Sequence, residues 1–554
     1  MDTVGRPGPS LSLAHGDRRA ILAASLGAAL EWYDFFVFGA LAAAIAVNFY
    51  GNLNSATAFV FALLSFAAGF VIRPLGALVF GRMGDRGGRK RTFLLTILVM
   101  GVATTLIGLL PPNSAVGIAA PIALIALRML QGFSLGGEYG AAATYVAERA
   151  PPDRRGEYTS WIQTTSTVGL LLSLAVVSAS RWISGPGFDT WGWRIPFLFS
   201  GILVVVSIVI RRSLSESPAF ARIKSTGRTS KAPLSEAFCE WRNLKLVLAS
   251  LFGLLAGQAV VWFTALFYSM YFLMQTLKIA PDTAILLVAI ALAISTPMYV
   301  GFGWLSDRIG RKPVILGGAG LAALTIFPLF HGLAVYGNPG LLEATRRSPV
   351  VLVANLDSCS WQFNPLGTSR FTTACDIGRS TLAASGAGFS SRDAAPDQPA
   401  TVMIGDAKVV VPRLAGLSLP DAVSAERAFK AKVLATLTNA GYPTKADPAK
   451  VHAPAIVALL TALMLLGAMT LAPISAALVE LFPTRIRYTA LSLPYHIGNG
   501  YFGGLLPTIC FAIVIESGNI FAGLWYPVIV AGLSCVIGLV AVRETYRTDI
   551  LTKD

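Results

Sequence analysis

The chain has 554 residues, of which 54% are hydrophobic and only 13% are charged. Soluble domains use about 25% charged residues, so this composition excludes an ordinary soluble protein and indicates one that spans a membrane. The formal net charge of +15 would also fit a nucleic-acid-binding protein, which makes the positions of the basic residues decisive.

Apolar segments recur along the chain, and each is long enough to cross a hydrocarbon core of about 30 Å as a helix. The residues before the first segment, 1–19, are polar for too long to be a cleaved signal peptide, so we expect an uncleaved signal anchor. The predicted spans are 20–48, 57–81, 92–110, 118–147, 158–180, 193–211, 244–274, 281–303, 313–335, 453–479, 488–514 and 521–542.

Most of the 44 Lys and Arg residues lie in the two termini and in alternate short loops. Only Arg181, Arg194 and Lys278 lie at the short loops of the opposite side. By the positive-inside rule, this asymmetry predicts that both termini are cytoplasmic. The basic charge therefore reflects topology, and we expect no nucleic-acid partner. The chain also has no Gly-Lys pair, so no ATP-binding phosphate loop is predicted.

One charged motif occurs twice, 222 positions apart, each time between the second and third helix of a six-helix set. This repeat predicts two equivalent halves. The first copy consists of Gly81, Asp85, Arg86, Gly88, Arg89 and Lys90, and the second of Gly303, Asp307, Arg308, Gly310, Arg311 and Lys312.

A second pair of landmarks follows the fourth helix of each half. Glu148 is followed by prolines and Arg154, and Glu480 by a proline and Arg485. The two glutamates are 332 positions apart. The difference between the two offsets indicates about 110 residues inserted into the second half. The predicted organisation is a tail 1–19, a six-helix half 20–211, a central loop 212–243, helices 7–9 in 244–337, an insert 338–452, helices 10–12 in 453–542 and a tail 543–554.

The insert follows the third helix of its half, so we expect it on the external side. Segment 401–414 has the pattern of strands and 418–441 that of a helix, which predicts a small α/β module. Cys359 and Cys375 both lie in the insert, and an oxidising periplasm favours a disulfide between them over two free thiols.

A charged side chain inside a membrane span requires a partner or a function, because it is costly in hydrocarbon. Glu31 and Asp34 share one face of the first helix, and either couples protons or substrate or is solvated near an aqueous end. The fourth helix carries a stripe of Arg128, Gln131 and Glu138, which is either a coupling site or a static ion pair.

Three further residues are candidates for contact with a substrate or proton. Arg73 of the second helix suits a bidentate grip on a carboxylate, or pairs with Glu31 or Asp34. His496 and Asn499 lie in a polar, glycine-rich part of the eleventh helix, where a lone histidine is more often a packed residue.

The duplicated motif resembles that of the major facilitator superfamily. The stretches "LEWYDFFVFG" (30–39), "RMLQGFSLGGEYGAAATYVAE" (128–148), "SESPAF" (215–220) and "LFPTRIRYTALSLPYHIG" (481–498) are similar to its metabolite:proton symporter branch. The resemblance implies an all-α fold of 12 transmembrane helices in two six-helix repeats. It also implies that Asp85 and Arg89 pair with neighbouring helix ends when the cytoplasmic side is closed. The alternative is that the motifs only anchor the topology.

From these features we expect a bacterial inner-membrane importer of a small organic anion, driven by the proton gradient, without a cofactor or metal. Its partners would be a small-molecule substrate, protons and the lipid bilayer, and we expect a monomer. Two alternatives stay open, namely uptake of a zwitterionic osmolyte such as proline or betaine, and a receptor that binds through the insert. No nucleophile-base arrangement points to an enzyme.

Overall fold

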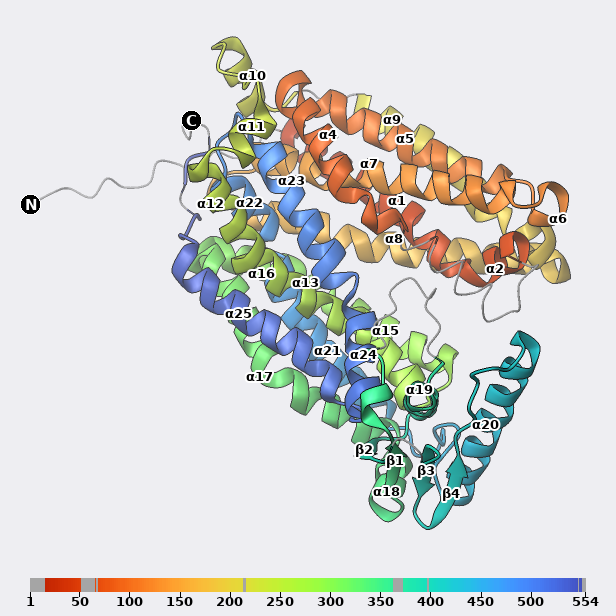
Figure 1. Ribbon diagram of the computed structural model, residues 1–554. Helices are drawn as coiled ribbons and strands as arrows, with labels where there is room; N and C mark the ends of the chain where they lie inside the picture. The colour runs from red at the N-terminus through yellow and green to blue at the C-terminus, as the bar shows by residue number, and fades with distance from the viewer. Residues whose placement is uncertain are drawn as a thin grey trace, which may run out of the picture.

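The computed structural model describes residues 15–50, 65, 68–212, 216–361, 372–395, 398–546 and 548–550, without the side chains of 15–26, 31, 43 and 419. Two helical bundles lie side by side, and a small sheet module projects from one end of the second bundle (Figure 1). Ten helical segments in the described residues are long and apolar enough to cross a membrane, and a bent pair would make an eleventh.

The first bundle contains the N-terminal helices, up to α9, which ends at Arg212. Its first span bends by 67° between α1 and α2, and the beginning of the second predicted span lies outside the described residues. The helices are α1 (His15–Ala40), α2 (Ala42–Tyr50), α4 (Arg73–Gly87), α5 (Arg89–Leu109), α6 (Asn113–Val116), α7 (Ala119–Arg149), α8 (Arg155–Ser184) and α9 (Arg194–Arg212).

Small residues allow α7 to pack closely against α4. A Cβ atom on Gly132 would lie 2.0 Å from the carbonyl oxygen of Gly69, and one on Gly136 would lie 2.1 Å from that of Arg73. These two glycines are one helical turn apart and face the same way, as in small-xxx-small helix pairs of membranes. The close approach fixes Arg73 relative to α7, which carries Glu138.

The second bundle follows two short helices of the central loop and contains several π-helical segments. Its seventh span has π-helical turns at Leu251–Leu255, Thr264–Tyr268 and Phe272–Thr276, and its eleventh has one at Gly498–Gly503. The two loop helices are α10 (Pro218–Ser225) and α11 (Pro233–Phe238). The helices of the bundle are α12 (Trp241–Ser250), α13 (Ala256–Phe263), α14 (Ser269–Tyr271), α15 (Pro281–Ser295), α16 (Pro297–Ile309), α17 (Arg311–Gly337), α21 (Ala453–Leu471), α22 (Ile474–Leu481), α23 (Arg487–Ile497), α24 (Leu506–Ser517) and α25 (Trp525–Ala541).

The insert between α17 and α21 is an α/β module, as its sequence predicts. Its sheet has the strand order β2-β1-β3-β4, with β1 and β2 parallel and the other pairs antiparallel. A disulfide joins Cys359 to Cys375. The elements are α18 (Pro339–Arg347), β1 (Val350–Ala354), α19 (Ala374–Ser385), β2 (Phe389–Asp393), β3 (Thr401–Ile404), β4 (Ala407–Val410) and α20 (Leu419–Asn439).

The insert is packed against the second bundle. Phe429, Val433 and Leu437, which recur every fourth residue along α20, belong to one buried apolar cluster that continues into the second bundle. The amide of Phe389 donates to the carbonyl of Gly518 at 2.8 Å. Lys278 Nζ donates to the carbonyl of Ala384 at 2.6 Å. These contacts fix the module to the ends of the seventh and eleventh spans.

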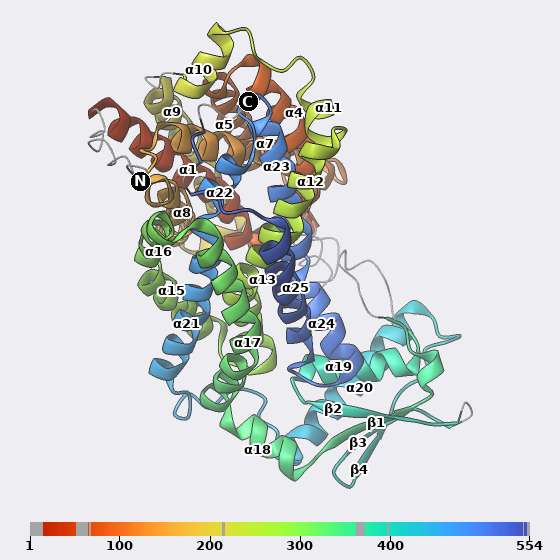
Figure 2. The ribbon, with the colours of Figure 1, turned by 90° about the vertical axis from the view of Figure 1, so that its left-hand side faces the viewer.

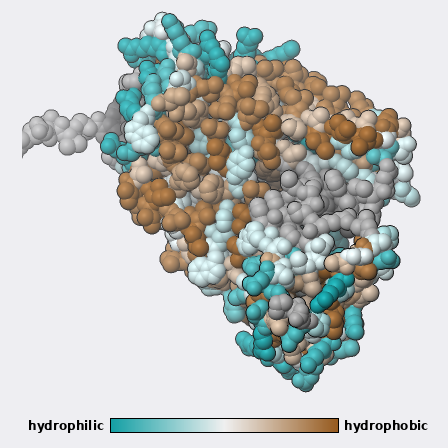
Figure 3. Space-filling model, viewed as in Figure 1, coloured by the Kyte–Doolittle hydropathy of each residue, from teal (hydrophilic) through white to brown (hydrophobic). Residues whose placement is uncertain are grey.

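The two ends of the molecule differ. The helices α10 and α11 and the end of the described chain lie at one end, and the sheet lies at the opposite end (Figures 1 and 2). A broad apolar band separates two more hydrophilic regions on the visible face (Figure 3). This pattern is that of a membrane protein whose two polar ends are exposed to water.

Candidate functional site

The first copy of the repeated motif joins the two bundles. Asp85, near the end of α4, accepts hydrogen bonds from the backbone amides of Tyr488 at 3.2 Å and Thr489 at 2.8 Å. These amides belong to the first turn of α23 in the other bundle, where a helix has unpaired N–H groups and a partial positive charge. Arg89 pairs with Asp85 and also donates to the carbonyl of Thr484 at 3.0 Å.

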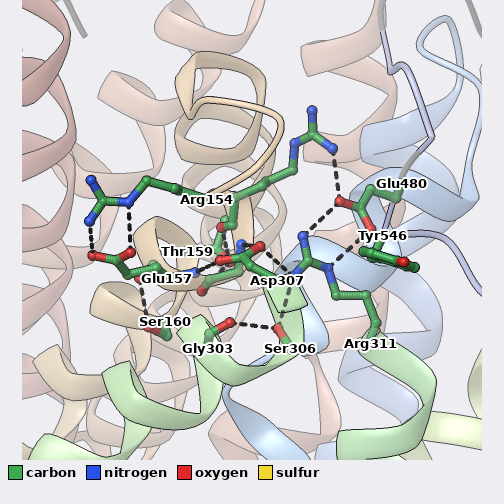
Figure 4. Close-up of polar contacts among 12 residues, drawn as sticks. Arg154, Glu157, Thr159, Ser160, Gly303, Ser306, Asp307, Arg311, Glu480 and Tyr546 are labelled. Carbon is green, nitrogen blue, oxygen red and sulfur yellow. Dashed lines mark hydrogen bonds and ion pairs between the residues drawn. The ribbon is translucent and has the colours of Figure 1, made fainter. Parts of the chain in front are cut away.

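The second copy makes the same arrangement with the bundles exchanged (Figure 4). Asp307 accepts from the backbone amides of Gly156 and Glu157, both at 2.8 Å, in the first turn of α8. Arg311 donates to Asp307 at 2.5 Å and pairs with Glu480 at 3.1 Å. Each motif therefore holds the N-terminus of a helix in the opposite half.

Two crossed ion pairs complete this network. Arg155 of the first bundle donates to Glu480 of the second at 2.8 Å, and Arg487 of the second donates to Glu148 of the first at 2.7 Å. The four side chains are at most 3% exposed. We call the set Asp85, Arg89, Glu148, Arg155, Asp307, Arg311, Glu480 and Arg487 the charged layer.

The motif glycines are required by geometry. Gly88 and Gly310 have φ angles of 114° and 107°, which only glycine adopts readily, and each precedes a helix. A Cβ atom on Gly81 would lie 2.8 Å from Cα of Thr489, and one on Gly303 would lie 2.6 Å from the carbonyl oxygen of Gly156. The motif glycines thus allow the two halves to touch, which topology anchors alone would not need.

Two predicted members of this site lie elsewhere. Arg154 is half exposed and pairs with Glu157 of its own helix, and Arg485 contacts Glu236 at 3.2 Å. The arginines that cross between the halves are Arg155 and Arg487, because they occupy the start of the helix and face the opposite half. Arg154 lies one residue before α8 and Arg485 two residues before α23, so neither occupies the first helical position from which the side chain reaches the opposite half.

The remaining basic residues of the motifs do not bridge the halves. Arg86 and Arg308 are exposed, and Arg308 lies over the ring of Trp304. Lys90 Nζ donates to the carbonyl of Arg212 at 3.0 Å, and Lys312 Nζ donates to that of Leu539 at 2.7 Å. Both lysines therefore bind helix C-terminal carbonyls within their own half.

Sequence reasoning missed two carboxylates that support the charged layer. Glu216 accepts from the amide of Arg89 at 3.1 Å, and Glu544 accepts from that of Arg311 at 2.9 Å. Each caps the helix that carries a motif arginine. Both follow the sixth helix of their half, and this equivalent placement was a signal that could have found them.

A cavity lies between the two bundles, beyond the charged layer. It is lined mainly by aromatic rings with a few polar groups, as small-molecule sites usually are. The polar and charged lining residues are Arg73, Glu138, Tyr139, Gln163, Ser166, Tyr495, His496 and Asn499, and the other rings are Trp32, Phe35, Phe36, Phe70, Trp262, Phe263 and Phe267.

Arg73 is the main cationic group of this cavity. It is 5% exposed, and its guanidinium lies 4.0 Å from the ring centre of Phe70 and 4.6 Å from that of Phe35. Within the described part of the chain, its Nε and Nη2 atoms make no hydrogen bond. The same holds there for Glu138 Oε2 and His496 Nε2. The cavity thus presents donors and an acceptor that a bound molecule can satisfy.

Contacts between the halves, and one contact within the second half, close the cavity beside these groups. The rings of Tyr139 and Tyr495 stack with a centroid distance of 3.3 Å, and Tyr139 bonds the hydroxyl of Ser475 at 2.9 Å. Asn499 and Gln258 exchange amide hydrogen bonds of 3.4 Å. The predicted candidate Asn499 therefore lines the cavity while it bridges the seventh and eleventh spans.

Three other predicted residues lie together but do not line this cavity. Arg128 donates to Gln131 at 2.6 Å, and Gln131 donates to Thr104 at 2.6 Å. Asp34 is 4% exposed and bonds Ser200 and Thr104. These residues form a polar chain inside the first bundle, separate from Glu138, so the predicted stripe on α7 is divided between two sites. The side chain of Glu31 lies outside the described residues.

No group of three or more His, Cys, Asp or Glu side chains that could hold a metal is present in the described ranges. The charged layer and the cavity both lie where the two bundles meet. The charged layer holds the halves together at one end, and the cavity is an aromatic site with a few polar groups between them.

Comparisons with known proteins agree with this architecture. Residues 20–243 match the family model described as "Sugar (and other) transporter". The chain is 38% identical over 331 residues to the shikimate transporter of Escherichia coli, covering 58% of this chain and 74% of that protein. It is 37% identical over 321 residues to the proline/betaine transporter of Salmonella typhimurium, covering 56% of this chain and 63% of that protein.

The fold is also that of a solved transporter. A structure of the proton:xylose symporter of the major facilitator superfamily aligns over 97% of this chain and 98% of its own, with a TM-score of 0.61 and 17% identity. At this identity the likeness concerns the fold alone.

Proposed function

Because this chain belongs to the major facilitator superfamily of metabolite transporters, we propose that it carries a small organic acid into the cell together with protons by alternating access. The relatives named above include a shikimate transporter. The charged layer is the closed side of such a cycle, and the cavity is the substrate site. Repeated six-helix halves around a midplane site are the usual basis of this mechanism.

The observation that carries the proposal is that Arg73 lines the cavity with hydrogen-bond donors that have no partner in the described residues. A buried guanidinium with unused donors in an aromatic cavity is suited to a carboxylate, which it can bind through two parallel hydrogen bonds. Binding would also compensate a buried charge that lacks a hydrogen-bonded carboxylate in the described chain. Phe35 and Phe70 hold the guanidinium plane and leave its edge for the ligand.

Protons would be carried by acidic groups that the membrane interior keeps from water. Glu138 lines the cavity, so its protonation can respond to the substrate. Asp34 lies on the separate polar chain with Thr104 and Ser200. We assign Glu138 to substrate-linked protonation and Asp34 to a proton site inside the first half.

The charge distribution supports one orientation in the membrane. We propose that the charged layer and both termini face the cytoplasm, because basic residues gather at that end. The insert would then be periplasmic, where its disulfide persists.

A second candidate is uptake of a zwitterionic osmolyte. The cavity contains Glu138 as well as Arg73, and its lining has several aromatic rings that suit a quaternary ammonium group through cation–π contacts. A zwitterion would satisfy both charges, whereas a simple acid would satisfy one.

The test is uptake by proteoliposomes that contain the full chain, under an imposed inward proton gradient, with labelled carboxylic acids, betaine and proline. Gradient-dependent accumulation of an acid, lost with an uncoupler, supports the proposal. Accumulation of betaine or proline alone supports the second candidate. Accumulation of an acid that is independent of the gradient would contradict proton coupling.

A further inference from the structure

A second pocket lies outside the transport cavity, at the end of the molecule that carries α10 and α11. It is lined by Arg228, Thr229, Ser230, Lys231 and Glu236 of the central loop and by Arg485 of the loop before α23. The pocket therefore joins the linker between the halves to the second half. Hydrophilic residues dominate the surface at this end (Figure 3).

The central-loop wall of the pocket has a defined shape. Gly227, with a φ angle of 69°, ends α10, and the amide of Arg228 turns back to the carbonyl of Ile223 at 2.9 Å. Ser230 donates to Glu236 at 2.6 Å, and its hydroxyl accepts from the amide of Ala232 at 3.1 Å. Ser230 is 5% exposed, so this part of the loop is held in place rather than free in solvent.

The charges of the pocket are unbalanced. Three cationic side chains, Arg228, Lys231 and Arg485, face a single carboxylate, that of Glu236. Arg485 Nε lies 3.2 Å from Glu236 Oε2, yet neither atom makes a hydrogen bond within the described residues. Arg485 thus has an ion-pair partner but retains donors for another acceptor.

From this arrangement we propose that the pocket binds a phosphate-bearing anion, either a free phosphate or the headgroup of an acidic lipid. A phosphate group offers several oxygen acceptors, which match two guanidinium groups, an ammonium group and the hydroxyl of Thr229. A pocket at the end of membrane-spanning helices can be reached by lipid headgroups as well as by soluble anions, and basic segments there attract acidic lipids.

Because of the position of Arg485, an anion bound in this pocket would affect the charged layer. Arg485 stands between Thr484, whose carbonyl accepts from Arg89, and Arg487, which binds Glu148. An anion that bridges Arg485 and the central loop would hold the segment from Thr484 to Arg487 in the arrangement that closes the charged layer. Occupancy therefore stabilises the closed end and slows its opening.

The experiment compares binding to the full-length protein and two matched double variants. Arg228→Ala/Lys231→Ala removes two pocket charges, and Arg222→Ala/Lys224→Ala removes two charges from exposed positions of the same loop outside the pocket. The melting temperature in detergent is followed during titration with inorganic phosphate at constant ionic strength. Lipid binding is counted by native mass spectrometry after reconstitution with phosphatidylglycerol or phosphatidylcholine.

We expect saturable stabilisation of the wild-type protein and of the outer variant, and an apparent affinity at least about tenfold weaker in the pocket variant, since two charge-assisted contacts are lost. Saturation by inorganic phosphate identifies a free phosphate as sufficient. Retention of phosphatidylglycerol alone identifies a lipid headgroup. Equal binding by both double variants, or equal effects of chloride and phosphate on the wild type, would overturn the proposal. This readout does not depend on which substrate is transported.

Discussion

Arg487 at the start of α23 donates a hydrogen bond of 2.7 Å to Glu148 at the end of α7, and this contact joins the two halves of the molecule. Arg155 and Glu480 repeat it with the halves exchanged, at 2.8 Å. The two pairs lie at positions that are related by the same offset of 332. The duplicated sequence has therefore produced a layer in which each half supplies an arginine to a carboxylate of the other half.

The capping aspartates should control how firmly this end is closed. Asp85→Asn or Asp307→Asn keeps an acceptor but removes the negative charge at a helix N-terminus, which contributes up to about 2 kcal/mol in a buried setting. We expect the open population of the charged end to rise roughly five- to thirtyfold. The open population is measured from distances between spin labels by double electron–electron resonance. The labels are attached at the exposed positions 86 and 308 through Arg86→Cys and Arg308→Cys in a Cys239→Ser background.

The matched control for this measurement is Asp153→Asn, an exposed carboxylate at the same end. It should leave the distance distribution unchanged. If Asp85→Asn and Asp307→Asn gave the wild-type distribution as well, the helix-capping contacts would not hold the halves together.

The Glu148–Arg487 pair should show strong coupling in a double-mutant cycle. Arg487→Gln leaves a buried carboxylate without its cation, which costs about 3–5 kcal/mol, whereas Glu148→Gln/Arg487→Gln removes both charges. We expect the double variant to melt at a higher temperature than Arg487→Gln. The pair of Arg154 and Glu157 is the control, because its arginine is half exposed and surface pairs contribute about 0–1 kcal/mol. Additive effects of the two substitutions would contradict the pairing.

The cavity arginine should be required for its planar shape as well as its charge. Arg73→Lys keeps the charge but loses the two-pronged donor, so we expect KM for the acid to rise by about tenfold or more with normal insertion. Arg128→Lys, on the polar chain away from the cavity, should lower the melting temperature but have little effect on KM. Uptake measured over a range of substrate concentrations gives KM for each variant. An unchanged KM in Arg73→Lys would show that Arg73 does not bind the substrate.

The disulfide of the insert should contribute measurable stability. Cys359→Ser/Cys375→Ser opens a link across 16 positions, and a loop of this length corresponds to about 3 kcal/mol in the chain-entropy account. We expect a lower unfolding temperature of the insert, followed by hydrogen exchange of β1 and α19, and the same effect of a reductant on the wild-type chain. Cys239→Ser, which removes an exposed free thiol, is the control. Identical exchange with and without reductant would contradict a structural role.

Several features of the molecule could be predicted from local sequence patterns. Membrane spans are long apolar runs, so hydropathy predicts them, and ten or eleven such helices lie in the described residues. The offsets of the repeated motifs predict the position of the insert. The family resemblance implied that Asp85 contacts a helix end, and the structure shows this contact and an equivalent one for Asp307. The single pair of cysteines in the insert predicted the disulfide.

The sequence by itself determined this protein's class, its two halves and the position of its insert, because these depend on composition and spacing along the chain. Only the tertiary structure decided that Arg155 and Arg487 bridge the halves while Arg154 and Arg485 do not, because the first two begin helices whose N-termini face the opposite half and the other two lie before those helices. It also separated Asp34 from the cavity that Arg73 and Glu138 line. Such assignments depend on how neighbouring helices are rotated and packed, which is fixed by contacts between residues far apart in the chain.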